Sequence, residues 1–380
     1  MKYYLIAGEA SGDTHGANLI KGLAAADPTA EFRFWGGDRM AAAAGRTNLV
    51  KHYRETSFFG VFEVLRNLRK VFSQLEECRR DIEAFAPDVV ILIDYPGFNM
   101  RIARFAWRRH MKVFYYISPK VWAWKERRVE QIRKYVDRLF IILPFEREYF
   151  AAKGIDAIYE GNPSVDDIAE RLAAVPDRDV FMHDNGLSVD DTRPLVALLA
   201  GSRRSEIKHN LPFMVRLAES MPDCRFAVAG VPWLDESLYR NIIAGSTNIT
   251  LLIDQTCTLV RHADAAVVTS GTATLETALI GTPEVVCYRT DPLTVWVGRS
   301  VLKIKYISLV NLIMDRATVT ELIQNDMSTE RAESELRAIL PGGSRRQRML
   351  DDYRELYDRV GGTGTSARVA ARMVEELLKK

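Results

Sequence analysis

The sequence is poor in the residues that build disulfide frameworks and metal centres. Its 380 residues include four cysteines without a CxxC pair and six histidines that never fall at HxxxH spacing. This spacing predicts neither a disulfide framework nor a zinc site, and we expect the cysteines to be small buried side chains. The single DRD string, at 177–179, lies in a weakly patterned stretch. We expect no bound metal and no cofactor.

Long apolar runs and the common nucleophile and nucleotide motifs are also missing. No stretch approaches the roughly 18 to 20 apolar residues that span a bilayer, and the apolar start of the chain is too short for the core of a signal peptide. The chain has neither P-loop spacing nor a GxSxG elbow, which argues against nucleoside-triphosphate hydrolysis and covalent catalysis. We expect a cytoplasmic protein.

Charge is unevenly distributed along the chain, although the formal net charge is only +2. The stretch 99–138 carries twelve Lys/Arg against three acids, interleaved with eight aromatic side chains. Such a stretch suits a polyanionic partner, which leaves nucleic acid, anionic lipid headgroups and a phosphorylated substrate open.

Short apolar runs alternate with helical patterns almost throughout, which predicts parallel sheets built from βαβ units. The fold class is therefore α/β with two doubly wound, Rossmann-like domains, and ligands are expected at the carboxyl ends of the strands. We predict the following division: an N-terminal domain over 1–165, a linker over 166–193, a second domain over 194–345, and over 346–380 two amphipathic helices that pack across domains or subunits.

One segment, 58–75, has the pattern of an amphipathic helix with an aromatic entry and a basic flank. This pattern fits an interfacial membrane helix, and it equally fits an ordinary helix packed on a core. The candidate membrane-docking residues are Phe58, Phe59, Phe62, Leu65, Arg66, Leu68, Arg69 and Lys70.

Asp94 ends a strongly apolar strand and precedes a Pro-Gly turn. A carboxylate at that edge, in a medium of low dielectric, is a candidate general base. The alternative is an aspartate that caps the next helix or hydrogen-bonds within the turn.

Gly201, Ser202 and Arg203 repeat the strand–turn–helix pattern in the second half of the chain. Backbone amides at a helix start, together with a guanidinium, form a good pyrophosphate site.

A third such turn contains Ser270, Gly271 and Thr272, with Glu276 about one helical turn later. The Glu276 carboxylate is placed to accept the two hydroxyls of a ribose, or it belongs to a capping box with Thr272.

The glycines of the first strand–helix turn, Gly8, Gly12 and Gly16, suggest a phosphate loop, but they lack GxGxxG spacing. The amides near Ser11 and Gly12 at a helix start still suit a phosphate.

Seven strings carry a family resemblance. In chain order they are AGEASGDTHGANLI, IDYPGFN, YISPKVWAWKERR, AGSRRSEI, SGTATLE, YRTDPLTVW and YISLVNLI. Together they resemble the lipid-A-disaccharide synthases, from residue 6 to about residue 323. The resemblance implies a GT-B-like fold with a cleft between the two domains. It also implies inverting transfer of 2,3-diacylglucosamine from UDP-2,3-diacylglucosamine to 2,3-diacylglucosamine 1-phosphate.

The resemblance also implies roles for residues. Asp94 matches the family's candidate base, and Arg203, Glu276 and Asn311 match residues on the nucleotide side. The complete predicted UDP-sugar set is Gly201, Ser202, Arg203, Tyr288, Ser270, Gly271, Thr272, Glu276 and Asn311. The predicted acceptor set is Ser11, Gly12, Asp13 and Asn99, which assigns the glycine loop to the acceptor rather than to the nucleotide.

Lipid substrates favour membrane docking of 58–75, and they imply a peripheral association with the cytoplasmic surface of the inner membrane. The family also implies a possible homodimer through the C-terminal region, and no nucleic acid as partner. The chain departs from the family in reading GNPS where a Gly-His-Pro turn is common, so no histidine role passes to Asn162.

Three rival functions remain open on the sequence. They are another UDP-sugar enzyme of this fold, such as a UDP-N-acetylglucosamine epimerase, a nucleic-acid-binding protein, and a membrane scaffold without catalysis.

Overall fold

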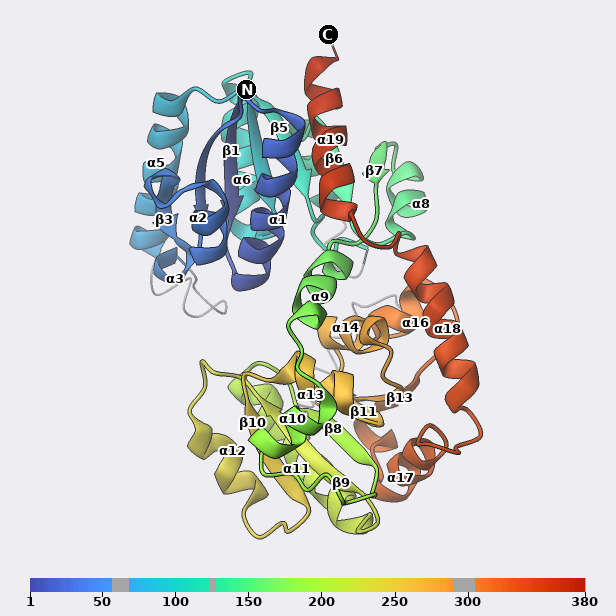
Figure 1. Ribbon diagram of the computed structural model, residues 1–380. Helices are drawn as coiled ribbons and strands as arrows, with labels where there is room; N and C mark the ends of the chain where they lie inside the picture. Colours follow the sequence, from blue (N-terminus) through green and yellow to red (C-terminus); the bar gives the residue numbers. More distant parts are fainter. Residues whose placement is uncertain (57–67, 123–127, 290–304, 380) are drawn as a thin grey trace. The chain divides into compact units, whose positions relative to one another are not determined.

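The structure is a computed structural model that describes residues 1–56, 68–122, 128–289 and 305–379. The chain forms two compact units (Figure 1). Unit 1 contains Met1–Asp167 and Val360–Lys380, and unit 2 contains Ile168–Arg359.

Unit 1 is built on a seven-stranded parallel sheet with the strand order β3-β2-β1-β4-β5-β6-β7. Its strands are β1 (Lys2–Ala7), β2 (Glu31–Gly36), β3 (Leu49–His52), β4 (Val89–Ile93), β5 (Lys112–Tyr116), β6 (Arg138–Ile141) and β7 (Ala157–Tyr159). Its helices are α1 (Ala10–Ala26), α2 (Asp38–Ala44), α3 (Tyr53–Thr56), α5 (Leu68–Phe85), α6 (Pro96–Arg108), α7 (Arg128–Tyr135), α8 (Glu146–Ala151) and α19 (Thr365–Leu378), while α9 (Ser164–Ala173) crosses into unit 2.

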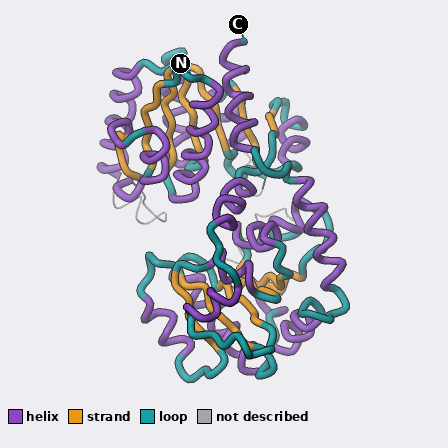
Figure 2. The backbone as a smooth tube through the Cα atoms, viewed as in Figure 1, coloured by secondary structure: helices purple, strands orange, loops and turns teal. Residues whose placement is uncertain are grey.

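Alternate residues of each strand in unit 1 enter different hydrophobic cores, because successive side chains point to opposite faces of a sheet. Tyr3 and Leu5 pack with α1, α2 and α19, whereas Tyr4 and Ile6 pack with α5, α6 and α7. Both faces of the sheet are therefore covered by helices, which Figure 2 shows as purple layers beside the orange strands. This double covering explains why the strands read as continuous apolar runs.

Unit 2 contains a six-stranded parallel sheet with the order β10-β9-β8-β11-β12-β13. Its strands are β8 (Leu195–Leu199), β9 (Arg225–Gly230), β10 (Ile249–Ile253), β11 (Ala265–Thr269), β12 (Glu284–Tyr288) and β13 (Thr320–Ile323). Its helices are α10 (Arg178–Asp184), α11 (Arg204–Ser220), α12 (Glu236–Ile243), α13 (Thr256–His262), α14 (Thr272–Ile280), α16 (Leu309–Met314), α17 (Thr329–Arg337) and α18 (Arg346–Arg359).

The order of the strands in both units reverses beside the first strand, β1 in unit 1 and β8 in unit 2. Parallel doubly wound sheets bind ligands at the carboxyl ends of the strands at this reversal. The predicted α/β class with two Rossmann-like domains is confirmed, and apolar runs such as KYYLIA, VVILI and LVALL form parallel strands.

The division into units differs from the predicted boundaries. The stretch 166–193, expected to be a linker, contains most of α9 and all of α10. Ile168, Phe181 and Met182 of these helices are buried in the core of unit 2, an apolar pattern hidden by the charge and proline around it. The two C-terminal helices form, α18 in unit 2 and α19 in unit 1.

Asn162 stands near the first crossing between the units and is almost fully buried. Its side-chain oxygen accepts a hydrogen bond from the Ser164 amide at 2.9 Å, and its own amide donates to the Val360 carbonyl at 2.8 Å. Asn162 therefore caps the start of α9. It also links the N-terminal segment of unit 1 to Val360, where the chain returns to this unit.

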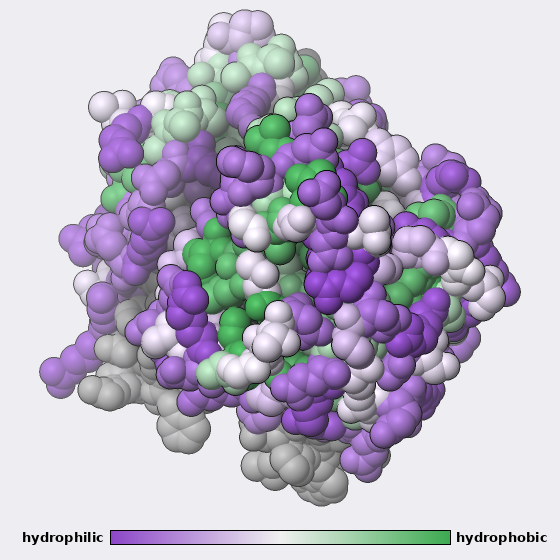
Figure 3. Space-filling model, turned by 60° about the horizontal axis from the view of Figure 1, so that its bottom comes forward, coloured by the Kyte–Doolittle hydropathy of each residue, from purple (hydrophilic) through white to green (hydrophobic). Residues whose placement is uncertain are grey.

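None of the helices in the described ranges is long and apolar enough to cross a bilayer. The face of the molecule in Figure 3 is covered mostly by hydrophilic side chains, with hydrophobic ones gathered in smaller groups.

Glu284, the first residue of β12, is fully buried, and neither carboxylate oxygen has a hydrogen-bond partner among the described residues. Burial raises the pKa of its carboxyl well above the usual value. The native state therefore holds this group protonated at a pH where the unfolded chain ionises it. Its contribution to stability is complete below the unfolded-state pKa and is lost as the pH rises through the native pKa.

We predict that Glu284→Gln, which has the same shape without an ionisable proton, raises the free energy of unfolding at pH 8 by at least about 1 kcal/mol. The gain should shrink toward pH 5. Urea unfolding across this pH range measures it, with the exposed Glu219→Gln as control. Equal stability of Glu284→Gln and the native chain at pH 8 would contradict the prediction.

Candidate functional site

Asp94 lies where β4 ends and α6 begins, in a tightly held turn. Asp94 and Tyr95 both have left-handed backbone conformations, with φ of 44° and 46°. Such angles cost on the order of 1 kcal/mol or more for residues other than glycine. The turn is held because the Asp94 amide donates to the Tyr116 carbonyl at 3.0 Å, and the Asp94 carbonyl accepts from the Tyr115 hydroxyl at 2.7 Å.

Asn99 completes this support and does not face solvent. It is fully buried, and its amide nitrogen donates to the carbonyls of Asp94 at 2.8 Å and Ile93 at 3.2 Å. The sequence places Asn99 in the predicted acceptor set. In this structure the donors of its amide nitrogen hold the Asp94 turn.

The Asp94 carboxyl has the electrostatics of a general base. Burial and the nearby Glu9 raise its pKa, while Lys120 and the Tyr95 amide lower it, and the balance is about 6. The alternative of a helix-capping role has no support, since no side chain caps the start of α6, whereas the hydrogen bond from the Tyr95 amide to the Asp94 carboxyl fits the alternative of bonding within the turn. A carboxylate with a pKa near 6 is mostly ionised at neutral pH and still basic enough to accept a proton.

Sequence reasoning did not single out Lys120 and Glu9, although both interact with Asp94. Lys120 belongs to the loop after β5, within the YISPKVWAWKERR string. Glu146, almost fully buried, fixes this loop: its carboxylate accepts hydrogen bonds from the Ser118 hydroxyl at 2.8 Å and the Trp122 indole at 3.0 Å. The loop that carries Lys120 is thus anchored on both sides of that residue.

The glycines of the first turn serve packing. A Cβ on Gly8 would lie 2.3 Å from the Tyr95 ring, and one on Gly16 would lie 2.7 Å from the Met40 sulfur. These residues must therefore be glycine for α1 and the Asp94 turn to approach β1. Gly12 is buried in the same helix, whereas Ser11 is exposed at its first turn.

Asp13, which the sequence places in the predicted acceptor set, is buried, and its carboxylate binds backbone amides within the protein. Its carboxylate accepts hydrogen bonds from the amides of Gly37 at 2.7 Å, Arg39 at 3.1 Å and Met40 at 3.1 Å. These amides belong to the start of α2, where a negative charge is favourable. Asp13 therefore joins α1 to α2 and has no free face toward a ligand in this structure.

In unit 2, the turn after β8 is organised by Glu206. Gly201 has a φ of 111°, and a Cβ there would lie 2.5 Å from the Glu206 side chain. The Glu206 carboxylate accepts from the amides of Ser202 at 2.9 Å and Arg203 at 3.2 Å. The two amides predicted to bind pyrophosphate are thus taken by a carboxylate of the same chain, a partner that the sequence prediction overlooked.

The Arg203 side chain is exposed and bonds to Glu206 at 2.9 Å. The guanidinium is therefore a solvent-accessible cation, and one of its nitrogens donates to the Glu206 carboxylate.

The turn after β11 presents Gly271 and Thr272 at the start of α14, both exposed. Ser270 is tied down, since its hydroxyl donates to the Ile307 carbonyl at 2.9 Å. Glu276, on the same helix, forms an ion pair with Arg171 at 3.1 Å. The capping-box alternative is wrong, because no side chain caps α14.

Asn311 is buried and fully engaged within the chain. Its amide nitrogen donates to the Val319 carbonyl and the Glu321 carboxylate, each at 2.9 Å, and its oxygen accepts from the amides of Thr318 and Val319. An asparagine side chain offers two donor hydrogens and two acceptor sites, so Asn311 has none left for a ligand in this arrangement. It holds the loop before β13. Tyr288, also predicted, ends β12 and is half-buried.

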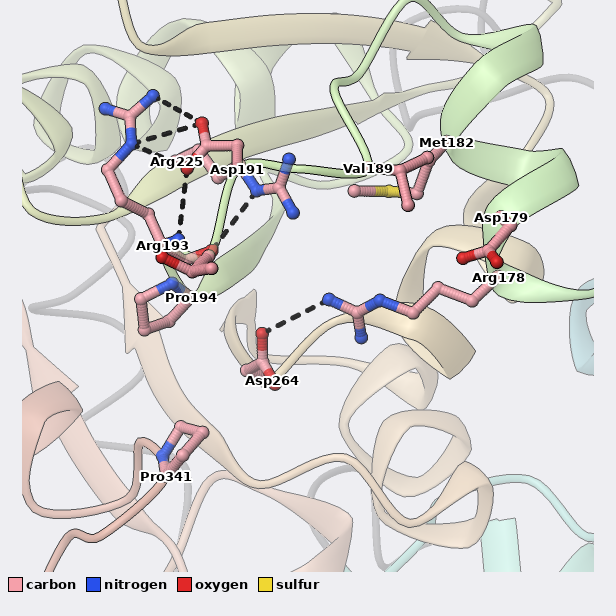
Figure 4. A pocket seen from close by; sticks show the side chains of 11 residues that line it. Arg178, Asp179, Met182, Val189, Asp191, Arg193, Pro194, Arg225, Asp264 and Pro341 are labelled. Atoms are coloured by element: carbon pink, nitrogen blue, oxygen red, sulfur yellow. Dashed lines mark hydrogen bonds and ion pairs between the residues drawn. The ribbon is translucent and has the colours of Figure 1, made fainter.

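A cavity of about 300 Å³ lies at the opposite, amino-terminal edge of the unit 2 sheet. Figure 4 shows Arg178 reaching toward Asp264, and Asp191 pairing with Arg193 beside Arg225. These charges compensate one another, and none of the predicted site residues lines this cavity.

The predicted membrane-docking residues Phe58, Phe59, Phe62, Leu65 and Arg66 lie outside the described residues. Leu68 begins α5, and Arg69 and Lys70 are exposed on it. The apolar pattern divides within this helix: Leu75 is buried in the core and Val71 packs against it, whereas Phe72 is 64% exposed.

Comparison with known proteins decides the family. The family model described as lipid-A-disaccharide synthetase matches residues 3–372. The chain belongs to the lipid-A-disaccharide synthase family. It is 38% identical over 378 residues to the lipid-A-disaccharide synthase of Myxococcus xanthus, covering 98% of this chain and 97% of that one. It is 37% identical to that of Syntrophus aciditrophicus, covering 99% and 97%. The prediction of a glycosyltransferase of lipid A assembly is confirmed.

Solved structures of low identity agree on the fold. The UDP-GlcNAc 2-epimerase of Neisseria meningitidis, solved with UDP-GlcNAc, has a TM-score of 0.64 at 12% identity, with both chains fully covered. A glycosyltransferase of kitacinnamycin has a TM-score of 0.63 at 14% identity, with 99% of each chain covered. At this identity the likeness shows the GT-B-like fold, shared by glycosyltransferases and epimerases.

The Asp94 environment predicts the pH dependence of the reaction. If the ionised carboxylate is the base, kcat/KM should rise as the pH passes through about 6 and then level off. Lys120→Met removes a cation that lowers the pKa, so this limb should move to higher pH. Glu9→Gln removes an anion that raises it, so the limb should move to lower pH.

Lys21→Met, on the exposed side of α1, is the control and should leave the limb in place. Rate profiles from pH 4.5 to 8.5 provide the measurement, and shifts of the same sign in Lys120→Met and Glu9→Gln would show that Asp94 is not the titrating base.

Proposed function

We propose that this chain transfers 2,3-diacylglucosamine from UDP-2,3-diacylglucosamine to the 6-hydroxyl of 2,3-diacylglucosamine 1-phosphate. The products are the β(1→6)-linked disaccharide 1-phosphate and UDP. Family membership over residues 3–372 supports the reaction class. The observation that carries the assignment of chemistry is the Asp94 carboxyl, with a pKa of about 6, held at the carboxyl edge of the unit 1 sheet.

In this mechanism the acceptor oxygen attacks the anomeric carbon from the face opposite the UDP group. The new bond joins that oxygen to the anomeric carbon, the bond from this carbon to the diphosphate oxygen breaks, and Asp94 takes the hydroxyl proton. One displacement inverts the configuration, so an α-linked donor gives a β-linked product.

The leaving diphosphate gains negative charge as this bond breaks, and unit 2 offers groups that stabilise it. Arg203 is an exposed cation at the turn after β8, and the amides at the start of α14 carry partial positive charge. The Glu276 carboxylate, oriented by Arg171, supports the proposed contact with the ribose hydroxyls.

The acceptor carries a 1-phosphate, and unit 1 supplies a cation beside the base. Lys120 is exposed, interacts with Asp94 and lies on a loop anchored by Glu146. Together with the exposed Ser11 it forms the proposed acceptor phosphate contact, which replaces Asp13 and Asn99 in that role.

The acylated substrates require access to a lipid surface, and we propose that the segment 58–75 docks on the cytoplasmic face of the inner membrane. The described part of this segment supports the proposal, because Phe72 is exposed on the same helix as Arg69 and Lys70. An apolar side chain with adjacent cations suits an anionic interface. A homodimer through the C-terminal region is part of the same proposal.

Incubation of the protein with the diacylated UDP-sugar, with and without the acylated monosaccharide phosphate, tests this function. UDP and disaccharide should form together, and only with both substrates present. An epimerase of the same fold needs no acceptor, so UDP release or sugar isomerisation without acceptor would overturn the proposed function.

Phe72→Ser should weaken sedimentation with vesicles that contain anionic lipid, by about twofold to tenfold. The physical reason is the loss of one exposed aromatic side chain from the interface. Val180→Ser removes a similarly exposed apolar residue from α10 in unit 2 and should change nothing. Equal sedimentation of Phe72→Ser and the native chain, with unchanged thermal midpoints, would exclude Phe72 from docking.

A further inference from the structure

Trp233 is the most exposed aromatic side chain of unit 2 among the described residues, at 68%. It lies in the loop between β9 and α12, at the carboxyl edge of the sheet. Leaving an indole in water forfeits a large hydrophobic gain, since burial of such a side chain stabilises a protein by about 2 kcal/mol or more. An aromatic ring kept at the ligand-binding edge therefore calls for a partner.

The indole is held in place although its faces are open. Its Nε1–H donates to the carbonyl of Ser202 at 3.1 Å. The loop is anchored on both sides of the ring: the Val231 amide donates to the Tyr239 hydroxyl at 3.1 Å, and Asp235 caps α12 by accepting from the Ser237 amide at 2.9 Å. A ring fixed in this way loses little conformational entropy when a ligand stacks on it.

The position of this hydrogen bond places the ring beside the turn with the proposed diphosphate contact. Ser202 stands between Gly201 and Arg203, and β8 and β9 are hydrogen-bonded neighbours that end at the same edge. In a nucleoside diphosphate a single pentose separates the base from the first phosphate. A base stacked on Trp233 therefore leaves its diphosphate near the guanidinium of Arg203.

The charge around the ring favours a neutral planar ligand over a membrane. Asp235 and Glu236 lie two and three residues after Trp233 and are both exposed. Arg240 pairs with Glu236 and Arg204 lies near Asp235, so the acids and cations beside the ring offset one another and give it no excess positive charge for an anionic lipid surface. A nucleobase has a flat face and carries no charge, and stacking of one base on an aromatic side chain contributes about 1–3 kcal/mol.

We propose that Trp233 is the stacking surface for the nucleobase of the donor. This inference rests on the proposed UDP-sugar function and adds a binding residue that reads the base rather than the diphosphate. Trp233 contributes to donor affinity through the uracil ring, and the adjacent Arg203 contributes through the diphosphate.

Titration calorimetry of the full chain with UDP and with inorganic pyrophosphate tests the inference. Trp233→Ala should weaken UDP binding about tenfold or more and leave pyrophosphate binding unchanged. Trp233→Phe keeps an aromatic face and should bind UDP within about threefold of the native chain. Tyr357→Ala, an exposed aromatic on α18 of the same unit, is the control and should bind as the native chain does.

A fluorescence titration provides a second readout that does not depend on the alanine variant folding. UDP should quench the tryptophan emission of the native chain, and this quenching should be lost in Trp233→Phe although UDP still binds.

The failures of the two proposals are distinguishable. If the native chain does not bind UDP, the donor assignment itself is wrong. If the native chain and Trp233→Ala bind UDP equally, or if Trp233→Ala loses pyrophosphate affinity to the same extent as UDP affinity, the stacking role is wrong while the donor assignment stands.

Discussion

The carbonyl of Asp94 receives two side-chain hydrogen bonds, from Tyr115 and the buried Asn99. These bonds hold two consecutive residues in left-handed conformations that their side chains disfavour. This turn places the Asp94 carboxyl, with a pKa of about 6, at the edge of the sheet. Burial of the carboxyl within this turn is the largest cause of its raised pKa. The turn that carries the proposed base therefore depends on hydrogen bonds from Tyr115 and Asn99.

In unit 2, hydrogen bonds from polar side chains likewise hold the turns at the carboxyl ends of the strands. Glu206 binds the amides of Ser202 and Arg203, and thereby sets the turn that carries the exposed Arg203 side chain. Asn311 similarly spends its whole hydrogen-bonding capacity on the loop before β13. In both units polar side chains such as Asn99, Glu206 and Asn311 shape loops through hydrogen bonds within the chain, whereas the exposed Arg203 and Trp233 are the proposed ligand contacts.

Sequence patterns predicted most of the strands, the fold class and the turns at Asp94, 201–203 and 270–272, because apolar runs and strand-end turns are local signals. The short strands β3, β7 and β13 were not predicted. They did not separate residues that face a ligand from residues that hold a turn. Asp13 is a polar residue in a promising motif, yet its carboxylate caps α2. Glu146 and Lys120 gave no pattern of their own, since their roles arise from the packing of loops distant in sequence. Such partners become visible only in the folded chain.

The proton acceptor itself is tested most directly by Asp94→Asn, which keeps the size of the side chain and removes its basicity. Turnover with both substrates should fall by at least about 100-fold, while UDP binding measured by calorimetry stays within about twofold of the native chain. This separation is expected because Asp94 belongs to unit 1 and the proposed UDP contacts to unit 2. Near-native turnover of the folded Asp94→Asn variant would contradict the assignment of Asp94 as the base.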